Sequence, residues 1–595
     1  MDGIMAAQFQ AYHLAGAVVG VSHRNEVLLA KGYGQADLER RLPVDPADTL
    51  FRLASVTKLF TWTAVMQLAE EGRLDLDQDV NRYLSSLQIP STFPTPVTLN
   101  SLLAHTAGFE DRILRIFRHH PEDLLPLNLL LEWEMPERIR PPGQVGAYSN
   151  YGSALAALVV QEVSGLDWER FVEIRILEPL DMRRTSMRQP LPAELSSLAA
   201  VGYDFHDGGL LPQPFELPAA APAGGGSASA LDMLRFGAAL LPQASDRPSI
   251  LRPETRLQMQ ATLYTPSPDV PGMAHGFLLD DWNRQRVLFH PGDLFYMHSG
   301  LYLVPEEEFV LFVAFNAADG GRARQDFIHA LRERLFPPPT PEAAPAAAGS
   351  PAPPPHGLEG WYRPLRRSET TVDKLAELFA QIRVEAPGPG QLRTRPVLGL
   401  PRLWQELRPT VYQENRRPQT LVFVTAEDGT LRMFEGNRAV LGYERARWFE
   451  TAAFHLYLLV ACVLVLLTPL LFPLVNLLME IRSDRMLARR PPTQKPARLL
   501  AALVALLFLT FLGWVAWQAA DPQQFTYDLH PAWFWMLLLP MSGAVLSVVQ
   551  ALVMVMAWRG GYWGFLARLH YTVITLAAWA MIWQLGYWNF LGWNY

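Results

Sequence analysis

Cysteine is almost absent from this chain, and several motifs that would define a function directly are missing as well. The single cysteine, Cys462, lies inside an apolar run. One cysteine excludes a disulfide framework and a CxxC metal or redox site. Neither HExxH nor GxSxG occurs in the sequence. The first absence excludes a zinc protease of that type, and the second argues against an ordinary α/β-hydrolase.

Charge is also sparse. Only 18% of the 595 residues are charged, the formal net charge is -7, and no basic stripe is present. Such a chain cannot neutralise many phosphates, so we expect no nucleic-acid partner. The histidines show no metal-ligand spacing, and the pair His119-His120 is typical of a polar loop. We therefore expect neither a metal nor a cofactor.

What the chain has in abundance is apolar sequence, with 50% hydrophobic residues. Near the C-terminus, apolar runs occupy residues 452–479, 499–518, 532–558 and 569–590. Each is long enough to cross about 30 Å of hydrocarbon as a helix. Four runs in succession, with Trp and Tyr near their ends, predict four membrane spans rather than buried core helices.

The loop charges predict an orientation for these spans. The loops at residues 480–498 and 559–568 are rich in arginine, whereas residues 519–531 contain Asp521 and Asp528 and no Lys or Arg. Basic loops are cytoplasmic as a rule, so the part before residue 452 is expected on the outer face of a bacterial inner membrane. The N-terminal sequence lacks the pattern of a signal peptide. Either the true start of the chain lies upstream of Met1, or processing has removed a signal peptide, or the predicted orientation is inverted.

Composition divides the rest of the chain. Residues 1–336 are compositionally even and alternate strand-like with helix-like patterns, which predicts one mixed domain. Residues 337–357 are rich in Pro and Ala and are typical of a semi-rigid linker. Strand-like runs such as residues 421–424 predict a small β-rich domain over residues 358–450. Residues 451–595 form the membrane domain.

Lysine is scarce, and one lysine lies at a spacing from a serine that suits a catalytic pair. The chain has lysine only at Lys31, Lys58, Lys374 and Lys495, and Lys58 alone has a serine three residues earlier, Ser55. Residues three apart share a helix face, so the amine can reach the hydroxyl. In a buried pocket the amine is neutral and can accept the serine proton, which arginine cannot do. The plain alternative is that Ser55 is only the N-cap of the helix.

Two further segments have residues suited to the same chemistry. The Tyr148 phenol could exchange protons with Ser55, and the Asn150 amide could hold a substrate carbonyl. The third segment, His290-Pro291-Gly292, precedes the strand-like run at residues 309–316. Both signals are short, since Tyr-x-Asn and His-x-Gly each recur elsewhere in the chain.

In order, these segments resemble the serine β-lactamase and penicillin-binding-protein superfamily, in particular its class C and D,D-peptidase-like branch. The resemblance covers about residues 10–336. It rests on FRLASVTKLFTWTAVMQLAEEGRLDLDQDV, on LLAHTAGF, on the Tyr-x-Asn region, on AGGGSASALDMLRF and on HPGDLFYMHSGLYLVP. The first segment is similar to the family's nucleophile helix, and the last is similar to its third motif.

The resemblance implies an α+β fold, in which an antiparallel sheet with flanking helices adjoins a helical lobe and the site lies between them. It implies Ser55, Lys58 and Tyr148 as catalytic residues, and Asn150, His290 and Gly292 as substrate-binding residues. It also implies an oxyanion hole made by the backbone N–H groups of Ser55 and Asp293.

One departure bears on the activity. Where class C β-lactamases have lysine in the third motif, this chain has His290, and the glutamate base of class A enzymes has no counterpart. We therefore predict a membrane-anchored serine hydrolase that forms an acyl-enzyme with peptides of the D-amino-acid type or with esters. The alternatives are a true β-lactamase acting on β-lactam-like substrates, a membrane sensor that is acylated without turnover, and an inactive scaffold that binds cell-wall peptides.

Overall fold

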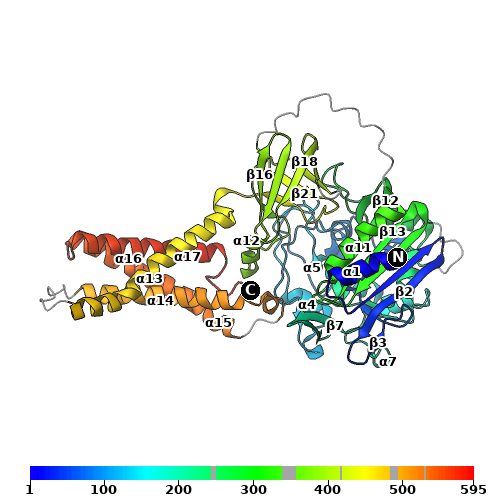
Figure 1. The fold of residues 1–595 in the computed structure, drawn as a ribbon, viewed down its shortest axis with the longest axis horizontal. Coiled ribbons are helices and arrows are strands. Elements are labelled where there is room, and N and C mark those ends of the chain that lie inside the picture. Colours follow the sequence, from blue (N-terminus) through cyan, green and yellow to red (C-terminus); the bar gives the residue numbers. More distant parts are fainter. Residues whose placement is uncertain (243–248, 338–356, 416–418, 483–492, 528–530) are drawn as a thin grey trace.

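The computed structural model describes residues 1–595 except 243–248, 338–356, 416–418, 483–492 and 528–530. Three parts follow one another along the chain (Figure 1). A mixed α/β part comes first, a β-barrel second, and long apolar helices last. Most of the predicted linker, residues 337–357, lies outside the described residues.

The first part contains a seven-stranded antiparallel sheet, in the order β11-β12-β13-β14-β1-β2-β3. The N-terminal strands β1 and β2 form a hairpin, and β1 also pairs with β14, the last of these strands along the chain. The strands are β1 (Gly16–His23), β2 (Glu26–Asp37), β3 (Leu42–Pro43), β11 (Leu278–Trp282), β12 (Gln285–Asp293), β13 (His298–Val304) and β14 (Phe309–Phe315).

The sheet is buried on both faces, and the alternation of side chains assigns each residue to one face. In β1, Val18 joins the core cluster that contains α9 residues, whereas Val19 joins the cluster that contains α1 and α11 residues. One face is therefore covered by α9 (Ala230–Ala239) and the other by α1 (Asp2–Ala11) and α11 (Gly320–Leu335).

A helical lobe lies beside the sheet. Its central helices α2 and α5 pack against each other, and almost every side chain of α2 is buried, as its apolar circumference predicts. The lobe includes α2 (Lys58–Glu70), α3 (Leu99–Leu103), α4 (Leu127–Trp133), α5 (Asn150–Ser164), α6 (Trp168–Val172) and α8 (Ala221–Gly224). The short 3-10 turn η1 (Ala54–Thr57) enters α2 and touches β12, β13 and α8, so it lies where lobe and sheet meet.

The predicted β-rich domain is a closed eight-stranded barrel. Buried aromatic residues, including Tyr362, Trp404, Tyr412 and Phe423, form its core cluster. Its strands are β15 (Gly360–Pro364), β16 (Ile382–Gly388), β17 (Gln391–Pro396), β18 (Arg402–Arg408), β19 (Val411–Glu414), β20 (Thr420–Thr425), β21 (Leu431–Glu435) and β22 (Tyr443–Arg445). Between β15 and β16 the chain leaves the barrel and forms η6 (Val372–Ala376) and α12 (Glu377–Ala380).

Four helices in the described part of the chain are long and apolar enough to cross a membrane, as the sequence predicts. The candidate spans are Ala452–Leu471, Gln494–Gln518, Ala532–Gly560 and Phe565–Tyr587. They fall in α13 (Ala452–Arg482), α14 (Gln494–Gln518), α15 (Ala532–Met536) with α16 (Leu538–Gly560), and α17 (Phe565–Tyr587). The arginine-rich connection at residues 483–492 lies outside the described residues.

One end of this bundle contacts the first part of the chain (Figure 1). Phe117 donates its backbone N–H to the carbonyl oxygen of Thr526 over 2.9 Å, and Tyr296 Oη donates to Gln523 Oε1 over 2.9 Å. The α14–α15 connection therefore lies at the same end of the bundle as the mixed domain. The α16–α17 connection, which Arg559 and Arg568 flank, lies at the opposite end, because each helix runs the length of the bundle.

Candidate active site

Ser55 and Lys58 lie together at the junction of lobe and sheet. Lys58 is fully buried, and its Nζ donates to Ser55 Oγ over 3.0 Å and to the carbonyl oxygen of Ala223 over 2.6 Å. Burial holds the pKa of the Lys58 amine well below its usual range, and the positive charge of Arg366 lowers it further. The amine is therefore in a form that can accept a proton.

Ser55 does not cap the helix. It lies inside η1, the residue before α2 is Thr57, and neither element has a side-chain capping bond. The residue before the serine, Ala54, has φ of 49°, in the left-handed region that costs a non-glycine residue about 1–3 kcal/mol. The capping alternative therefore does not account for this serine.

Tyr148 lies against the same pair. The Lys58 Nζ is 5.0 Å from the centre of the Tyr148 ring, and the ring of His105 is 4.3 Å away between centres. The phenol oxygen is buried near Ser55 without a hydrogen bond of standard geometry. Burial raises the pKa of this phenol, although the contact with Ser55 lowers it in part. Tyr148 is therefore a neutral phenol at ordinary pH.

The residues after Tyr148 begin α5. Ser149 Oγ accepts the backbone N–H of Gly152 over 3.0 Å and caps the helix, while the Ser149 N–H donates to His105 Nδ1 over 3.2 Å. Asn150 is the first residue of α5. These contacts fix the chain direction at Tyr148 and Asn150, so both side chains have defined positions beside η1.

His290 comes from the end of β12 and is buried. Its Nδ1 donates to the carbonyl oxygen of Pro291 over 2.8 Å, and its ring centre lies 6.0 Å from that of Tyr148. Burial, with a contribution from Lys58, lowers the pKa of His290 to about 3. The imidazole is therefore neutral, at the position where class C β-lactamases have a lysine.

Gly292 is the point at which β12 approaches the nucleophile turn. A Cβ at this position would lie 2.1 Å from the carbonyl oxygen of Leu53 and 2.5 Å from Ser299 Oγ. No side chain fits at these distances. Glycine is thus required for the strand and η1 to lie this close.

Asp293 follows directly. Its carboxylate pairs with His298 Nδ1 at 2.7 Å and with Arg324 Nη2 at 2.9 Å. These two partners outweigh the effect of burial and hold the pKa of the Asp293 carboxyl below its usual range. His298, which the sequence places beside the third motif without a role, therefore orients Asp293.

A cavity of about 140 Å³ opens beside this cluster. Ser55, Asn150 and Asp293 line it, whereas Lys58, Tyr148 and His290 are not among its lining residues. Much of the remaining wall is apolar and comes from the lobe and the loops at residues 110–117 and 218–224, including Leu114, Ile116, Phe117, Leu130, Leu131, Pro218, Ala219, Ala223 and Leu294. The wall also carries the charged residues Glu110, Asp111, Arg112 and Glu134, so a reacting carbonyl at Ser55 would meet both apolar and charged groups.

Sequence reasoning missed two residues at this site. Arg366, which follows β15, forms an ion pair with Asp111: its Nη2 donates to Asp111 Oδ1 over 3.1 Å, and its Nε lies 2.8 Å from Asp111 Oδ2. Its guanidinium carbon lies 5.2 Å from the centre of the Tyr148 ring. No sequence signal links residues on opposite sides of the predicted linker, so neither Asp111 nor Arg366 could be found from spacing.

The comparisons with known proteins agree with this fold. The family model described as Beta-lactamase matches residues 1–336. Protein flp of Staphylococcus aureus (strain N315) is 30% identical over 211 residues, which is 34% of this chain and 41% of that protein. The chain thus spans about two fifths of the length of this curated relative.

Two solved structures share the fold. The octameric penicillin-binding protein homologue from Pyrococcus abyssi matches with a TM-score of 0.51 and 21% identity, over 75% of this chain and 99% of that one. SurE matches with a TM-score of 0.54 and 22% identity, over 75% of this chain and 98% of that one. Three quarters of this chain is more than residues 1–336, so the likeness extends past the mixed domain.

Proposed function

Because the chain belongs to the beta-lactamase family of serine hydrolases, we propose that it is a membrane-anchored serine hydrolase. It forms an acyl-enzyme at Ser55 and acts on peptides of the D-amino-acid type or on esters. The observation that carries the proposal is the 3.0 Å contact between Ser55 Oγ and the fully buried Lys58 amine. A serine hydroxyl is a weak nucleophile until a neighbouring base accepts its proton.

In this mechanism Ser55 Oγ attacks the substrate carbonyl carbon, and its proton passes to Lys58 Nζ. We assign the base role to Lys58 rather than to Tyr148, because the buried phenol holds its proton and the buried amine does not. Tyr148 then passes its proton to the leaving amine or alcohol as the carbonyl–leaving-group bond breaks, and Lys58 gives the Ser55 proton to the Tyr148 oxygen, so that both side chains are neutral again in the acyl-enzyme. Water attacks the resulting ester of Ser55 and releases the acid.

The remaining candidate residues bind the substrate. The negative oxygen of the tetrahedral intermediate would accept the backbone N–H groups of Ser55 and Asp293, which line one cavity. The Asn150 amide would hold the carbonyl of the neighbouring substrate unit. Neutral His290 would contribute a hydrogen bond rather than a charge, which favours uncharged ester and amide groups next to the scissile bond.

The membrane helices indicate on which side of the membrane the hydrolase domain lies. We place the mixed domain and the barrel on the outer face, because they share one end of the bundle with residues 519–527, which contain no Lys or Arg, while Arg498, Arg559 and Arg568 flank the connections at the other end. In this orientation, the hydrolase acts on substrates at the outer surface of a bacterial inner membrane.

Intact mass spectrometry tests the function. The full-length protein in detergent is incubated with a fluorophosphonate, and separately with a panel of D-aminoacyl peptides, esters and β-lactams. We expect one fluorophosphonate adduct on Ser55, together with hydrolysis of a peptide or an ester. An acyl adduct on Ser55 that forms with a member of the substrate panel and is never hydrolysed would instead support the acylated sensor, and preferred β-lactam turnover would support a true β-lactamase.

A further inference from the structure

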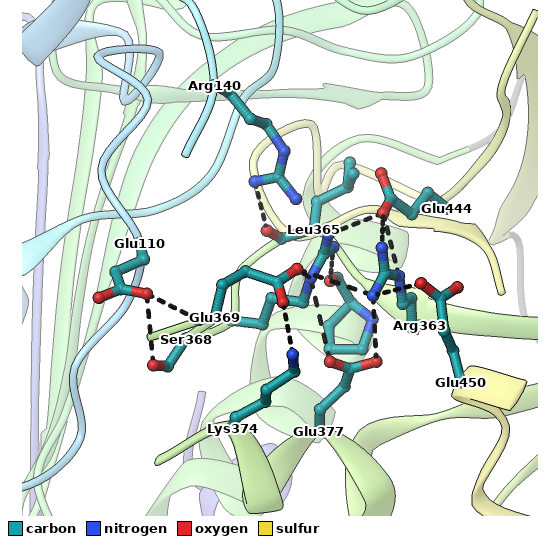
Figure 2. A network of polar contacts seen from close by, with 12 residues as sticks. Glu110, Arg140, Arg363, Leu365, Ser368, Glu369, Lys374, Glu377, Glu444 and Glu450 are labelled. Atoms are coloured by element: carbon teal, nitrogen blue, oxygen red, sulfur yellow. Dashed lines mark hydrogen bonds and ion pairs between the residues drawn. The ribbon is translucent and has the colours of Figure 1, made fainter. Parts of the chain in front are cut away.

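The segment that carries Arg366 is bound to the mixed domain through residues before and after Arg366. This segment, residues 365–371, is called the strap below. Arg140 Nη1 donates to the carbonyl oxygen of Leu365 over 2.8 Å, and the Asp111 N–H donates to that of Arg367 over 2.9 Å. Glu110 accepts the backbone N–H groups of residues 369 and 370 at 2.6 and 2.9 Å (Figure 2). Arg366 is thus held between bonded neighbours.

The other side of the strap is bound to the barrel. Arg367 Nη2 pairs with Glu444 of β22 at 2.8 Å, and Arg363 of β15 pairs with Glu444 at 3.0 Å and with Glu450 at 3.2 Å (Figure 2). Arg367 also pairs with Glu369 at 2.7 Å, and Glu377, which Figure 2 labels near Arg363, lies 3.9 Å from that arginine. Several buried or half-buried charges pair here at once, so the strap has one defined position.

The barrel also holds the backbone of the proposed catalytic tyrosine. The Tyr148 N–H donates to the carbonyl oxygen of Val440, in the connection between β21 and β22, over 3.0 Å. Ala147 forms an isolated bridge with Leu441 of the same connection. The β21–β22 connection of the barrel therefore holds the backbone of Tyr148, and Arg366, which follows β15, faces the Tyr148 ring.

Two cations lie near the one ring. Lys58 Nζ is 5.0 Å from the centre of the Tyr148 ring and the Arg366 guanidinium carbon is 5.2 Å from it. The Arg366 side chain is only 28% exposed and its partner Asp111 13%. A guanidinium stays protonated at any working pH, so its charge is permanent.

The other ionisable groups around Tyr148 and Lys58 carry little free charge of the same sign. Burial, with Lys58 as the next cause, lowers the pKa of His105 and of His290, so both imidazoles are neutral. The charged groups near Tyr148 and Lys58 form two ion pairs. Asp111 pairs with Arg366, and Asp293 pairs with Arg324. Arg366 is therefore the fixed cation whose removal changes the field at the Lys58 amine.

We propose that Arg366, supplied from the barrel side of the chain, is a positioning residue of the hydrolase site. Its permanent charge favours the neutral, proton-accepting form of Lys58 and stabilises negative charge on Tyr148 as protons move. This role rests on the proposed function of Ser55, Lys58 and Tyr148. It makes the active site a product of both parts of the chain, with the mixed domain incomplete without the barrel.

The Arg366 charge should shift the pH dependence of acylation in a defined direction. Arg366 lowers the pKa of both Lys58 and Tyr148, in addition to the effects of burial. If acylation needs neutral Lys58, its rate rises with pH through the pKa of that amine. Loss of the Arg366 charge raises this pKa, so Arg366→Gln should move the acidic limb of the rate profile upward by about one pH unit. Loss of the partner charge in Asp111→Asn should move it downward.

The experiment measures the pre-steady-state burst of the full-length protein with p-nitrophenyl acetate as a function of pH. We expect an upward shift for Arg366→Gln, a wild-type midpoint for Arg366→Lys, which keeps the charge, and a downward shift for Asp111→Asn. Arg367→Gln is the matched control, because that neighbouring arginine pairs with Glu444 and does not face Tyr148. It should change the amount of folded enzyme without moving the midpoint.

A purely structural role gives a different result. In that case Arg366→Gln, Arg366→Lys and Arg367→Gln all lower the burst amplitude, and every midpoint coincides with that of the wild type. Coincident midpoints for Arg366→Gln and the wild type would overturn the inference while the proposed function stands. A wild-type protein that gives neither a burst nor a mass shift on Ser55 would overturn both.

Discussion

The Lys58 amine and the carbonyl oxygen of Ala223 lie 2.6 Å apart, and this contact orients the proposed base. A neutral amine has two N–H groups and one lone pair. With one N–H directed to Ala223, the lone pair can face Ser55 Oγ at 3.0 Å. The backbone of α8 thus prepares the amine to accept a proton before any substrate binds.

Ser55→Ala should abolish labelling by fluorophosphonates and leave the fold intact. The Ser55 hydroxyl contacts Lys58 and does not cap α2, so its loss costs only about 1 kcal/mol. Labelling and circular dichroism of the detergent-solubilised protein measure the two effects. Ser153→Ala, which removes another buried hydroxyl in α5, is the control and should label normally. An Ser55→Ala protein that still labels would show that the nucleophile is another residue.

Tyr148→Phe should affect substrates according to their leaving group. A peptide amine must be protonated as it leaves, whereas p-nitrophenolate leaves without a proton. General-acid catalysis is worth about 10²–10⁴ in rate, so the variant should lose that factor with a peptide or alkyl ester and much less with a p-nitrophenyl ester. Equal losses of kcat/KM with both substrates would contradict the proton-transfer role of Tyr148.

Asp373→Asn should stabilise the protein more at high pH than at low pH. Asp373 accepts the backbone N–H groups of Ile113 and Leu114, and burial raises its pKa to about 7. A raised carboxyl pKa stabilises the folded state below the unfolded value near 4, and that stabilisation is lost as the pH rises through 7. Asparagine resembles the protonated form at every pH. The variant's advantage should therefore grow by roughly 2 kcal/mol between about pH 5 and pH 8.

Thermal unfolding in detergent across this pH range measures the difference. Wild type and variant share all other titrating groups, so the gap between their midpoints isolates Asp373. A gap that does not change with pH would mean that the Asp373 carboxyl has an ordinary pKa.

The orientation of the chain can be tested by inserting a site for a specific protease within residues 337–357. In intact spheroplasts we expect cleavage there, and protection of the same site inserted at residues 483–492. The two fragments should stay together after cleavage, because the strap and the bond from Tyr148 to Val440 hold the mixed domain to the barrel. The reverse pattern of protection would invert the membrane topology.

Much of the fold followed from local sequence patterns. The apolar run of β1, the largely apolar α2 and the four long runs near the C-terminus each specify an element from its own residues. Ser55 and Lys58 could be paired because three residues on a helix fix their distance. The family motifs then led to Tyr148, Asn150 and His290, which the structure places around or beside Ser55.

Contacts between distant segments could not be found in this way. Arg366 reaches Tyr148 only because the chain leaves the barrel after β15 and the strap is bound to Glu110 and Asp111. The barrel closes by pairing between its first strand, β15, and its last strand, β22. This closure sets where the strap begins. No periodicity or spacing in a single sequence reports such pairing.

The acylation rate of Lys58→Arg tests the central claim most directly. Arginine keeps the positive charge beside Ser55 but cannot accept a proton at any working pH. If neutral Lys58 is the base, pre-steady-state acylation by the full-length variant should fall by about 10²–10⁴ while the protein stays folded. Near-wild-type acylation by Lys58→Arg would contradict the account and leave Lys58 as an electrostatic partner of Ser55, with Tyr148 as the base.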